Sequence, residues 1–452
     1  MGKLFGTDGI RGRANHYPMT PEVALRVGRA ISFGKAHKGE SPPFIIIGKD
    51  TRISGDMLAM SLASGIAASG VDVYLADVLP TPGVAYLTRA MKAARGVVIS
   101  ASHNPYEDNG IKIFNGDGYK LSDEEEAAIE TFVQEESSPD RIRKDLPDPG
   151  VIRYLPEEAA SGYARFLRGI CGERAPFGGL QVVIDCSHGA TSQIAPILFR
   201  DAGAEIDPLS IMPDGRNIND GCGSEHPEAL SRKVVEKKAD LGIAFDGDGD
   251  RLIAVDETGC VLSGDQLIAI FADHLNKEGR LENNTVVTTV MSNVGLRVFL
   301  AERKIHHVIT DVGDRHVVKA LIDTGAILGG EDSGHMVFRD LHTTGDGLLS
   351  AIQLMKIVKN AKSPLSHLAS AIRLYPQVLK NVRVSRKPAF ESIPEISACI
   401  RRVEEKLGDK GRVLVRYSGT QSLCRVMVEG PTTEESDDCC ERIVSVIKKS
   451  LA

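Results

Sequence analysis

Residues 44–78 read FIIIGKDTRISGDMLAMSLASGIAASGVDVYLADV, and this stretch decides the fold. An apolar run rich in isoleucine leads through a polar loop into a helical pattern, and a second apolar run follows. This is the order of a βαβ unit. The same order returns at residues 180–209 and 285–310, so the sequence predicts three α/β domains of similar construction.

The carboxy-terminal part of the chain follows a different pattern. A strand at residues 381–385, a helix from about 394 to 407, two further strands and a final helix from about 434 to 451 are expected there. That β-α-β-β-α order indicates a smaller α+β domain. An acidic, proline-containing linker is expected at residues 134–150. The predicted domains are residues 1–150, 151–250, 251–373 and 374–452.

Composition excludes several classes of protein. The 452 residues carry a net charge of −7 with 25% charged residues, so there is no broad basic surface of the kind that non-specific nucleic-acid binding needs. No run approaches the roughly 20 apolar residues that cross a bilayer, and the amino terminus lacks the apolar core of a signal peptide. The eight cysteines form no C-x-x-C pair and are interpreted as reduced thiols. We expect a cytoplasmic protein without nucleic-acid or membrane partners.

Ser102 is the candidate nucleophile. The apolar run at residues 97–99 stops at small polar residues, and Asn104-Pro105 indicates a turn, so Ser102 is expected at the end of a buried strand. Loops at strand ends of α/β sheets often carry catalytic groups. A purely structural role is also open, in which Ser102, His103 and Asn104 only form hydrogen bonds within the turn.

Three aspartates alternate with glycines in DGDGDR, residues 246–251. Asp246, Asp248 and Asp250 would lie on one face of an extended backbone and form a hard-cation site. Oxygen ligands without His or Cys favour magnesium over zinc. An EF-hand is excluded because its sixth position requires glycine, whereas Arg251 stands there and a strand follows. A solvated acidic turn without a cation would also fit the spacing.

Two further loops offer polar groups for a ligand. GGEDSGH, residues 329–335, places Glu331, Ser333 and His335 at alternating positions, which suits the reading of sugar hydroxyls. RYSGTQS, residues 416–422, combines hydroxyls, a glycine and an arginine, and suits a grip on phosphate. Either loop taken alone is equally typical of a polar turn.

No nucleotide-binding loop is present among these motifs. The sequence contains neither G-x-x-x-x-G-K-[ST] nor G-x-G-x-x-G between a strand and a helix, so a nucleotide is not the expected phosphoryl donor. Ser102 also lies outside a G-x-S-x-G elbow. A serine, a magnesium site, a hydroxyl-reading loop and a phosphate grip fit together if the serine carries the phosphoryl group and magnesium neutralises its charge.

The motifs LFGTDGIRG, ISASHNP, DGDGDR, GGEDSGH and RYSGTQS, in this order along the whole chain, resemble those of the α-D-phosphohexomutase family. The resemblance implies α/β domains with mixed sheets and a smaller α+β domain around a central cleft. It makes Ser102 a phosphoserine, with one Mg²⁺ per subunit held by Asp246, Asp248, Asp250 and an oxygen of the Ser102 phosphate. Lys112 becomes the general acid/base, with Arg11 and His103 in the same pocket and His335 as a second acid/base candidate.

The resemblance also implies substrate contacts. Glu331 and Ser333 would bind sugar hydroxyls. The phosphate that does not react would be held by five residues: Arg416, Ser418, Gly419, Thr420 and Arg425. The sequence departs from the family pattern at Asp332, where glutamine is usual, and at Tyr417, Gln421 and Ser422. The first departure bears on amino-sugar preference, and the rest bear on the rigidity of the phosphate loop.

Ala101, GTDGIRG and NINDGCGSEHPE, residues 217–228, resemble the glucosamine branch of the family. That branch implies interconversion of glucosamine 6-phosphate and glucosamine 1-phosphate through glucosamine 1,6-bisphosphate, on the way to amino-sugar precursors of peptidoglycan, and it allows a homodimer. A phosphomannomutase or phosphoglucomutase would share every catalytic loop. A catalytically weak sugar-phosphate sensor would share them too, and a metal-dependent phosphatase fits less well.

Overall fold

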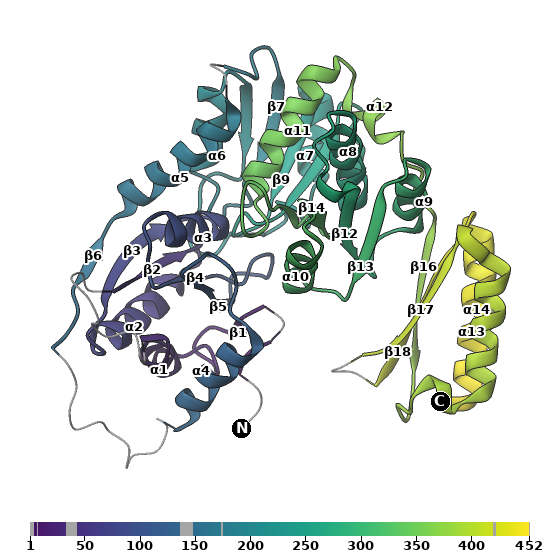
Figure 1. Ribbon diagram of the computed structural model, residues 1–452, viewed down its shortest axis with the longest axis horizontal. Helices are drawn as coiled ribbons and strands as arrows, with labels where there is room; N and C mark the ends of the chain where they lie inside the picture. The colour runs from purple at the N-terminus through teal and green to yellow at the C-terminus, as the bar shows by residue number, and fades with distance from the viewer. Residues whose placement is uncertain are drawn as a thin grey trace. The chain divides into compact units, whose positions relative to one another are not determined.

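The structure is a computed structural model that describes residues 4–6, 8–32, 43–135, 148–172, 175–418 and 422–451. By its contacts the chain divides into two units. The larger unit comprises Met1–Val290 and Val308–Ala369, and the smaller unit comprises Met291–His307 and Ser370–Ala452. Figure 1 shows the course of the chain through both. Most of the expected linker at 134–150 lies outside the described residues.

The first sheet is mixed. Its strand order is β1-β5-β4-β2-β3-β6, in which β2, β3, β4 and β6 run parallel and β1 and β5 run antiparallel to their neighbours. The strands are β1 (Ile10–Arg13), β2 (Phe44–Lys49), β3 (Asp72–Val78), β4 (Arg95–Ile99), β5 (Asp108–Asn115) and β6 (Ile152–Tyr154). The predicted strand before Ser102 is therefore β4, an interior strand of this sheet.

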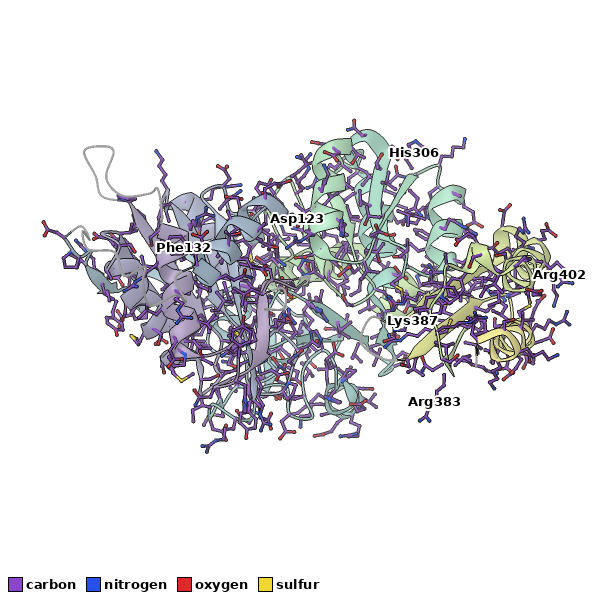
Figure 2. The ribbon with its side chains drawn as sticks, turned by 90° about the horizontal axis from the view of Figure 1, so that it is seen from below. Asp123, Phe132, His306, Arg383, Lys387 and Arg402 are labelled. Carbon is purple, nitrogen blue, oxygen red and sulfur yellow. The ribbon has the colours of Figure 1, made fainter. Side chains whose placement is uncertain are left out.

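Helices cover both faces of the first sheet (Figure 1). One face packs against α1 (Pro21–Ser32), α2 (Gly55–Ala67) and α4 (Asp123–Glu135), which share one apolar core with alternate strand residues such as Ile45 and Ile47. The other face meets α3 (Thr81–Ala90). Phe132 of α4, labelled in Figure 2, packs at the margin of the shared core.

The second sheet has the order β11-β10-β9-β7-β8. Its strands are β7 (Gln181–Asp185), β8 (Glu205–Leu209), β9 (Leu241–Phe245), β10 (Leu252–Asp256) and β11 (Val261–Leu262), and its helices are α5 (Pro156–Cys171), α6 (Ile194–Asp201) and α7 (Glu228–Lys237). The antiparallel pairing of β9 with β10 means that this sheet continues past the division predicted after residue 250. The division falls better after β11, because backbone hydrogen bonds join β10 and β11 to the second sheet.

The third sheet has the order β13-β12-β14-β15. Its strands are β12 (Thr285–Thr289), β13 (His306–Thr310), β14 (Leu328–Gly330) and β15 (Met336–Phe338). The helices of this part of the chain are α8 (Gly264–Lys277), α9 (Val294–Glu302), α10 (Asp314–Thr324), α11 (Gly347–Ala361) and α12 (Leu365–Ala369). Of these, α9 belongs to the smaller unit. A capping box between Ser263 and Gln266 begins α8.

The smaller unit contains the predicted α+β element order. β16 (Gln377–Arg383), β17 (Arg412–Tyr417) and β18 (Leu423–Glu429) form an antiparallel sheet with β18 in the centre, and α13 (Pro394–Leu407) and α14 (Thr433–Leu451) bury its apolar face. β16 begins earlier than the strand expected at 381–385, because it pairs with β18 over its whole length. Arg383 and Arg402 are exposed on this unit (Figure 2).

Three short 3₁₀ helices complete the described elements: η2 (Glu282–Asn284), η3 (Phe390–Ser392) and η4 (Gly408–Lys410). In the described ranges, no helix combines the length and apolar character that crossing a membrane requires. The eight cysteines are free thiols, and seven of them are buried. The structure therefore assigns the buried cysteines to packing rather than to a disulfide framework.

Two glycines allow α1 and α2 to pack closely. A Cβ atom at Gly28 would lie 2.2 Å from the Leu62 carbonyl oxygen, and one at Gly65 would lie 2.0 Å from the Leu25 carbonyl oxygen. We expect Gly28→Ala or Gly65→Ala to lower the free energy of unfolding by about 1–3 kcal/mol, because the helices must separate. Urea unfolding followed by circular dichroism measures the change.

Gly169 is the matched control, because it also lies within a helix, α5, but a Cβ atom there would meet no described atom within 4 Å beyond the backbone of its own helix and its chain neighbours. Gly169→Ala should leave stability unchanged or raise it by up to about 1 kcal/mol, since alanine loses less backbone entropy in a helix. Equal effects of all three substitutions would contradict the close-packing explanation.

Candidate active site

Ser102 lies in a strained loop that follows β4. Its φ is +55°, in the left-handed region that non-glycine residues rarely adopt, and only 1% of its surface is exposed. Its backbone N–H donates to Ser100 Oγ at 2.9 Å. A strained conformation persists where surrounding contacts enforce it, and such positions cluster at functional sites.

The Ser102 hydroxyl points at the second sheet. Ser102 Oγ donates to Asp246 Oδ2 at 2.6 Å and lies 3.3 Å from His103 Nδ1. Burial lowers the pKa of His103, and Arg251 and Arg11 lower it further against the opposing effect of Glu225. The structure therefore places the predicted nucleophile, a predominantly neutral imidazole and the first predicted metal ligand side by side.

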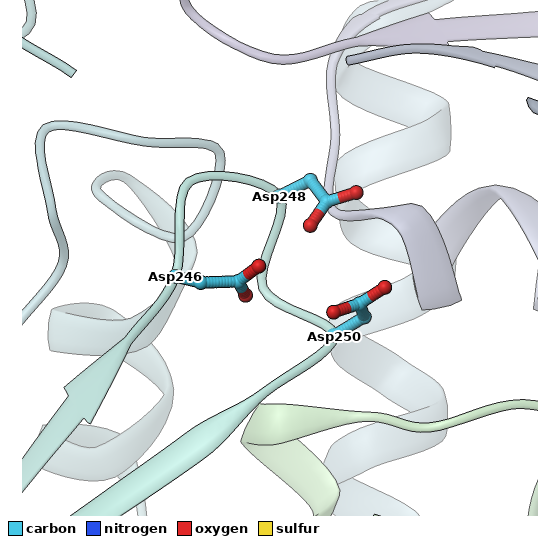
Figure 3. A group of neighbouring side chains, drawn as sticks. All are labelled: Asp246, Asp248 and Asp250. Atoms are coloured by element: carbon cyan, nitrogen blue, oxygen red, sulfur yellow. The ribbon is translucent and has the colours of Figure 1, made fainter. Parts of the chain in front are cut away.

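Asp246, Asp248 and Asp250 converge in the loop between β9 and β10 (Figure 3). One carboxylate oxygen from each lies within 4.8 Å of the others, and all three residues are buried. The predicted reason for this convergence, one face of an extended backbone, is wrong. The chain turns back at Gly249, whose φ is +73°, and the turn gathers side chains that an extended strand would spread along its length.

The three carboxylates fit a hard divalent cation. Burial, Asp250 and Asp248 raise the pKa of Asp246 well above its usual value. Within the described part of the chain, the buried Asp248 Oδ1 has no hydrogen-bond partner. A cation would satisfy that oxygen and remove the repulsion, and an all-oxygen donor set suits Mg²⁺.

Lys112, on β5, faces the same carboxylates. Its Nζ lies 2.7 Å from Asp248 Oδ2, 3.3 Å from Asp250 Oδ2 and 3.3 Å from Asp8 Oδ2, and the side chain is 1% exposed. Burial alone would lower the pKa of Lys112, but Asp248, Asp8 and Asp250 together raise it well above its usual value. Lys112 is therefore an ammonium in this arrangement.

Lys112 belongs to a closed ring of alternating charges in the larger unit. Asp8 pairs with Lys120, Lys120 pairs with Asp314, and His335 Nε2 lies 3.8 Å from Asp314 Oδ2. His335 Nδ1 lies 3.5 Å from Asp250 Oδ1, which closes the ring. Burial opposes the charge on His335, but Asp250 and Asp314 raise its pKa above the usual value.

Four residues of the site, Asp8, Lys120, Asp314 and Thr81, are not among those predicted from the sequence. Thr81 Oγ1 donates to Asp248 Oδ2 at 2.6 Å, and Thr81 N–H donates to the Asp248 carbonyl at 2.9 Å, so the start of α3 orients this carboxylate. Asp8 stands beside Arg11 in the GTDGIRG opening, which is a usable signal. Nothing in the local sequence marks Thr81, because its partner is 167 residues away.

Arg11, Glu331 and Ser333 are the remaining predicted residues of the larger unit. Arg11 pairs with Asp8. Glu331 is half-buried and its Oε1 accepts from Gly313 N–H at 2.9 Å, whereas Ser333 is exposed. Arg251 Nη1 lies 3.5 Å from Glu225 Oε1 and its Nε lies 4.0 Å from Asp250 Oδ1, so the guanidinium is held at the margin of the acidic loop.

The predicted phosphate-binding residues belong to the smaller unit. Arg416 on β17 and Arg425 on β18 are directly paired in the sheet, so both side chains leave the same face. Ser418 follows β17, is buried, and its carbonyl accepts from Lys387 Nζ at 2.5 Å. Gly419 and Thr420 lie outside the described residues.

Family models match nearly the whole chain in four successive parts. They are the phosphoglucomutase/phosphomannomutase α/β/α domain I at residues 2–140, domain II at 162–259, domain III at 263–375 and the C-terminal domain at 379–446. The chain therefore belongs to the phosphoglucomutase/phosphomannomutase family, the α-D-phosphohexomutases, as the motifs predict.

The chain is also similar to individual proteins of this family. A phosphoglucosamine mutase of Syntrophus aciditrophicus is 52% identical over 451 residues, which is 100% of both chains. A phosphoglucomutase/phosphomannomutase family protein of Burkholderia thailandensis has a crystal structure with a TM-score of 0.80 at 23% identity, covering 99% of this chain and 97% of that one. Aspergillus fumigatus N-acetylphosphoglucosamine mutase, solved with GlcNAc-6P and magnesium, has a TM-score of 0.66 at 17% identity, with 99% and 95% coverage. Both structures support the fold.

The buried carboxylates predict a cation-dependent stability. We expect Mg²⁺ to stabilise the protein by about 2.7 kcal/mol at a free concentration one hundred times its dissociation constant, through preferential binding to the folded state. Asp248→Asn should weaken this effect strongly, because it removes one ligand charge. Thermal unfolding across a magnesium titration measures both.

Asp256→Asn is the control, because Asp256, the last residue of β10, is also a buried acid but its Oδ1 caps a turn through Thr258 and Cys260. It should retain the full response to magnesium. A response that is the same in Asp248→Asn and wild type would contradict a cation site at the aspartates.

Proposed function

We propose that this chain interconverts glucosamine 6-phosphate and glucosamine 1-phosphate through a phosphorylated Ser102. The main supporting observation is the approach of Ser102 Oγ to Asp246 Oδ2 at 2.6 Å, because it joins a nucleophile to a cation site across two sheets. The full-length similarity to a phosphoglucosamine mutase supports the choice of substrate.

The proposed cycle consists of two phosphoryl transfers. Phospho-Ser102 first gives its PO₃ group to the free hydroxyl of the bound monophosphate, and glucosamine 1,6-bisphosphate results. The bisphosphate then reorients in the site, so that its other phosphate faces Ser102 and transfers its PO₃ group to the serine. Held by Asp246, Asp248 and Asp250, one Mg²⁺ per subunit would neutralise charge on the transferring oxygens.

Proton exchange is assigned to Lys112, with His335 as a second candidate. The attacking sugar hydroxyl loses a proton in the first transfer, and the departing sugar oxygen regains one in the second. Lys112 can take up this proton only as the neutral amine. A cation bound at the aspartates would offset the charges that raise the pKa of Lys112, and would so allow the amine to take up the proton and return it in the second transfer. Arg11 and His103 complete the lining of the reacting centre.

Binding of the sugar at both ends requires two further sets of contacts. Glu331 and Ser333 are proposed to bind hydroxyls, and the hydrogen bond from Gly313 N–H orients the Glu331 carboxylate. The phosphate that does not react is proposed to contact Arg416, Ser418, Gly419, Thr420 and Arg425. This separation of functions lets either end of the sugar occupy the reacting position. A homodimer and a cytoplasmic location stay predictions.

Ser102→Ala tests the covalent step. We expect kcat to fall by roughly 10⁴-fold or more, because the phosphoryl acceptor is removed, while the unfolding midpoint stays close to that of wild type. Intact-mass analysis should find one phosphoryl group on wild type after incubation with glucosamine 1,6-bisphosphate and none on the variant. Substantial turnover by Ser102→Ala would refute the phosphoserine cycle.

Substrate preference separates this function from phosphomannomutase and phosphoglucomutase activity. We expect kcat/KM for glucosamine 1-phosphate to exceed that for glucose 1-phosphate and mannose 1-phosphate by roughly tenfold or more. The reason is that a site built to bind the 2-amino group of glucosamine binds a 2-hydroxyl group less well. Coupled assays with all three compounds measure the ratios. An equal or higher value for glucose or mannose phosphate would reassign the substrate.

A further inference from the structure

Arg52 is a buried cation that contacts the backbone of the Ser102 loop. It is 1% exposed, and its guanidinium donates to the carbonyls of Ser102 at 2.9 Å, Asn104 at 2.7 Å and Asp108 at 3.1 Å, and also to that of Pro105. Four carbonyl oxygens between Ser102 and Asp108, the first residue of β5, thus converge on a single side chain. Such convergence defines the path of the loop.

Asp50 holds Arg52 in place and also reaches the loop. Its Oδ2 accepts from Arg52 Nε at 2.8 Å and from Ser100 Oγ at 2.5 Å, and Ser100 Oγ in turn accepts from Ser102 N–H. Asp50 is fully buried, so these contacts are shielded from water. The charge pair therefore spans the loop from Ser100 to Asp108.

Asn219, which lies in the second α/β domain, forms hydrogen bonds with the same loop. Its Nδ2 donates to the Ser102 carbonyl at 2.9 Å and to the Asn104 carbonyl at 3.0 Å, so it shares two acceptors with Arg52. Asn219 lies in the NINDGCGSEHPE motif, to which the proposed reaction assigns no role. Its side chain therefore connects this motif to the nucleophile.

Gly247 shows how closely these groups approach the acidic loop. A Cβ atom at this position would lie 2.6 Å from the Ser102 carbonyl oxygen and 2.9 Å from Asn219 Nδ2. Only glycine leaves room for the contact between the two loops. The Asn219 hydrogen bonds to the serine loop therefore lie directly against the segment that carries Asp246 and Asp248.

We propose that Asn219 and Arg52 are positioning residues that hold Ser102 in its left-handed conformation, with Oγ directed at the cation site. The proposal rests on the proposed function, because it concerns the reactivity of Ser102 in phosphoryl transfer. Two donors fix the Ser102 carbonyl, and the fixed backbone sets the direction of the side chain. Without them, a strained serine would relax and its hydroxyl would leave the line of transfer.

The test compares Asn219→Ala with Asn217→Ala. Asn217 belongs to the same loop, but the hydrogen bonds that its side chain makes within the described part of the chain, to Met212 and Asp214, stay inside that loop. Asn217→Ala therefore controls for a general loosening of the loop. We expect Asn219→Ala to lower kcat on glucosamine 1-phosphate by roughly 10- to 100-fold with KM changed less than about threefold. The initial rate at which glucosamine 1,6-bisphosphate phosphorylates Ser102, followed by intact mass, should fall by the same factor.

Thermal unfolding separates positioning from a structural role. Asn219→Ala should keep an unfolding midpoint near that of wild type, and Asn217→Ala should keep a near wild-type kcat. Arg52→Lys retains the charge beside Asp50 but cannot reach four carbonyls, so its kcat should fall at least as far as that of Asn219→Ala. If Arg52→Lys fails to fold, the Asn219→Ala result decides alone.

Three outcomes overturn the proposal. They are an Asn219→Ala kcat within about threefold of wild type, a loss expressed in KM rather than kcat, and a loss of activity and stability matched by Asn217→Ala. Wild-type protein that is inactive on glucosamine phosphates would instead refute the proposed function. The two failures are therefore distinguishable.

Discussion

The burial of three like charges in one loop is the constraint on which the rest of the site depends. Asp246, Asp248 and Asp250 repel one another in a low-dielectric environment. Their positive neighbours, Lys112, His335 and Arg251, lie mainly against Asp248 and Asp250 and leave the repulsion at Asp246. A bound cation would complete the compensation. Two hydroxyl groups orient the carboxylates toward a common position, because Thr81 donates to Asp248 and Ser102 donates to Asp246. The arrangement of the site is therefore explained first by the need to neutralise these buried charges.

The ring of alternating charges extends this arrangement through the larger unit. The ring draws on all three α/β domains. The first domain contributes Lys112, Asp8 and Lys120, the second contributes Asp250, and the third contributes Asp314 and His335. Each charge in the ring faces at least two of opposite sign, so the removal of one leaves its neighbours buried with only part of their compensation. The ring therefore holds Lys112 and His335, the two proton-exchange candidates, on either side of Asp250.

Local sequence patterns predict the site residues that lie within a recognisable motif. They predict Ser102 at a strand end because apolar residues 97–99 and Asn104-Pro105 delimit it, and β4 ends at Ile99 as expected. The spacing of the aspartates predicts their grouping, although the turn at Gly249 rather than an extended strand gathers them. Local patterns cannot predict the roles of four other residues, because each role depends on a contact with residues far along the chain. These are Thr81, Asp50, Arg52 and Asn219.

The amino-acid sequence alone determined the α/β class, the four-part order and the motifs that identify the family, because strand and helix periodicity and short loops are local properties. Tertiary structure decided how the motifs act together. Only folding brings Ser102 to Asp246, 144 residues away, and joins the Ser102 carbonyl to both Arg52 and Asn219. Distances between side chains on different sheets depend on packing over the whole unit, and no local pattern encodes them.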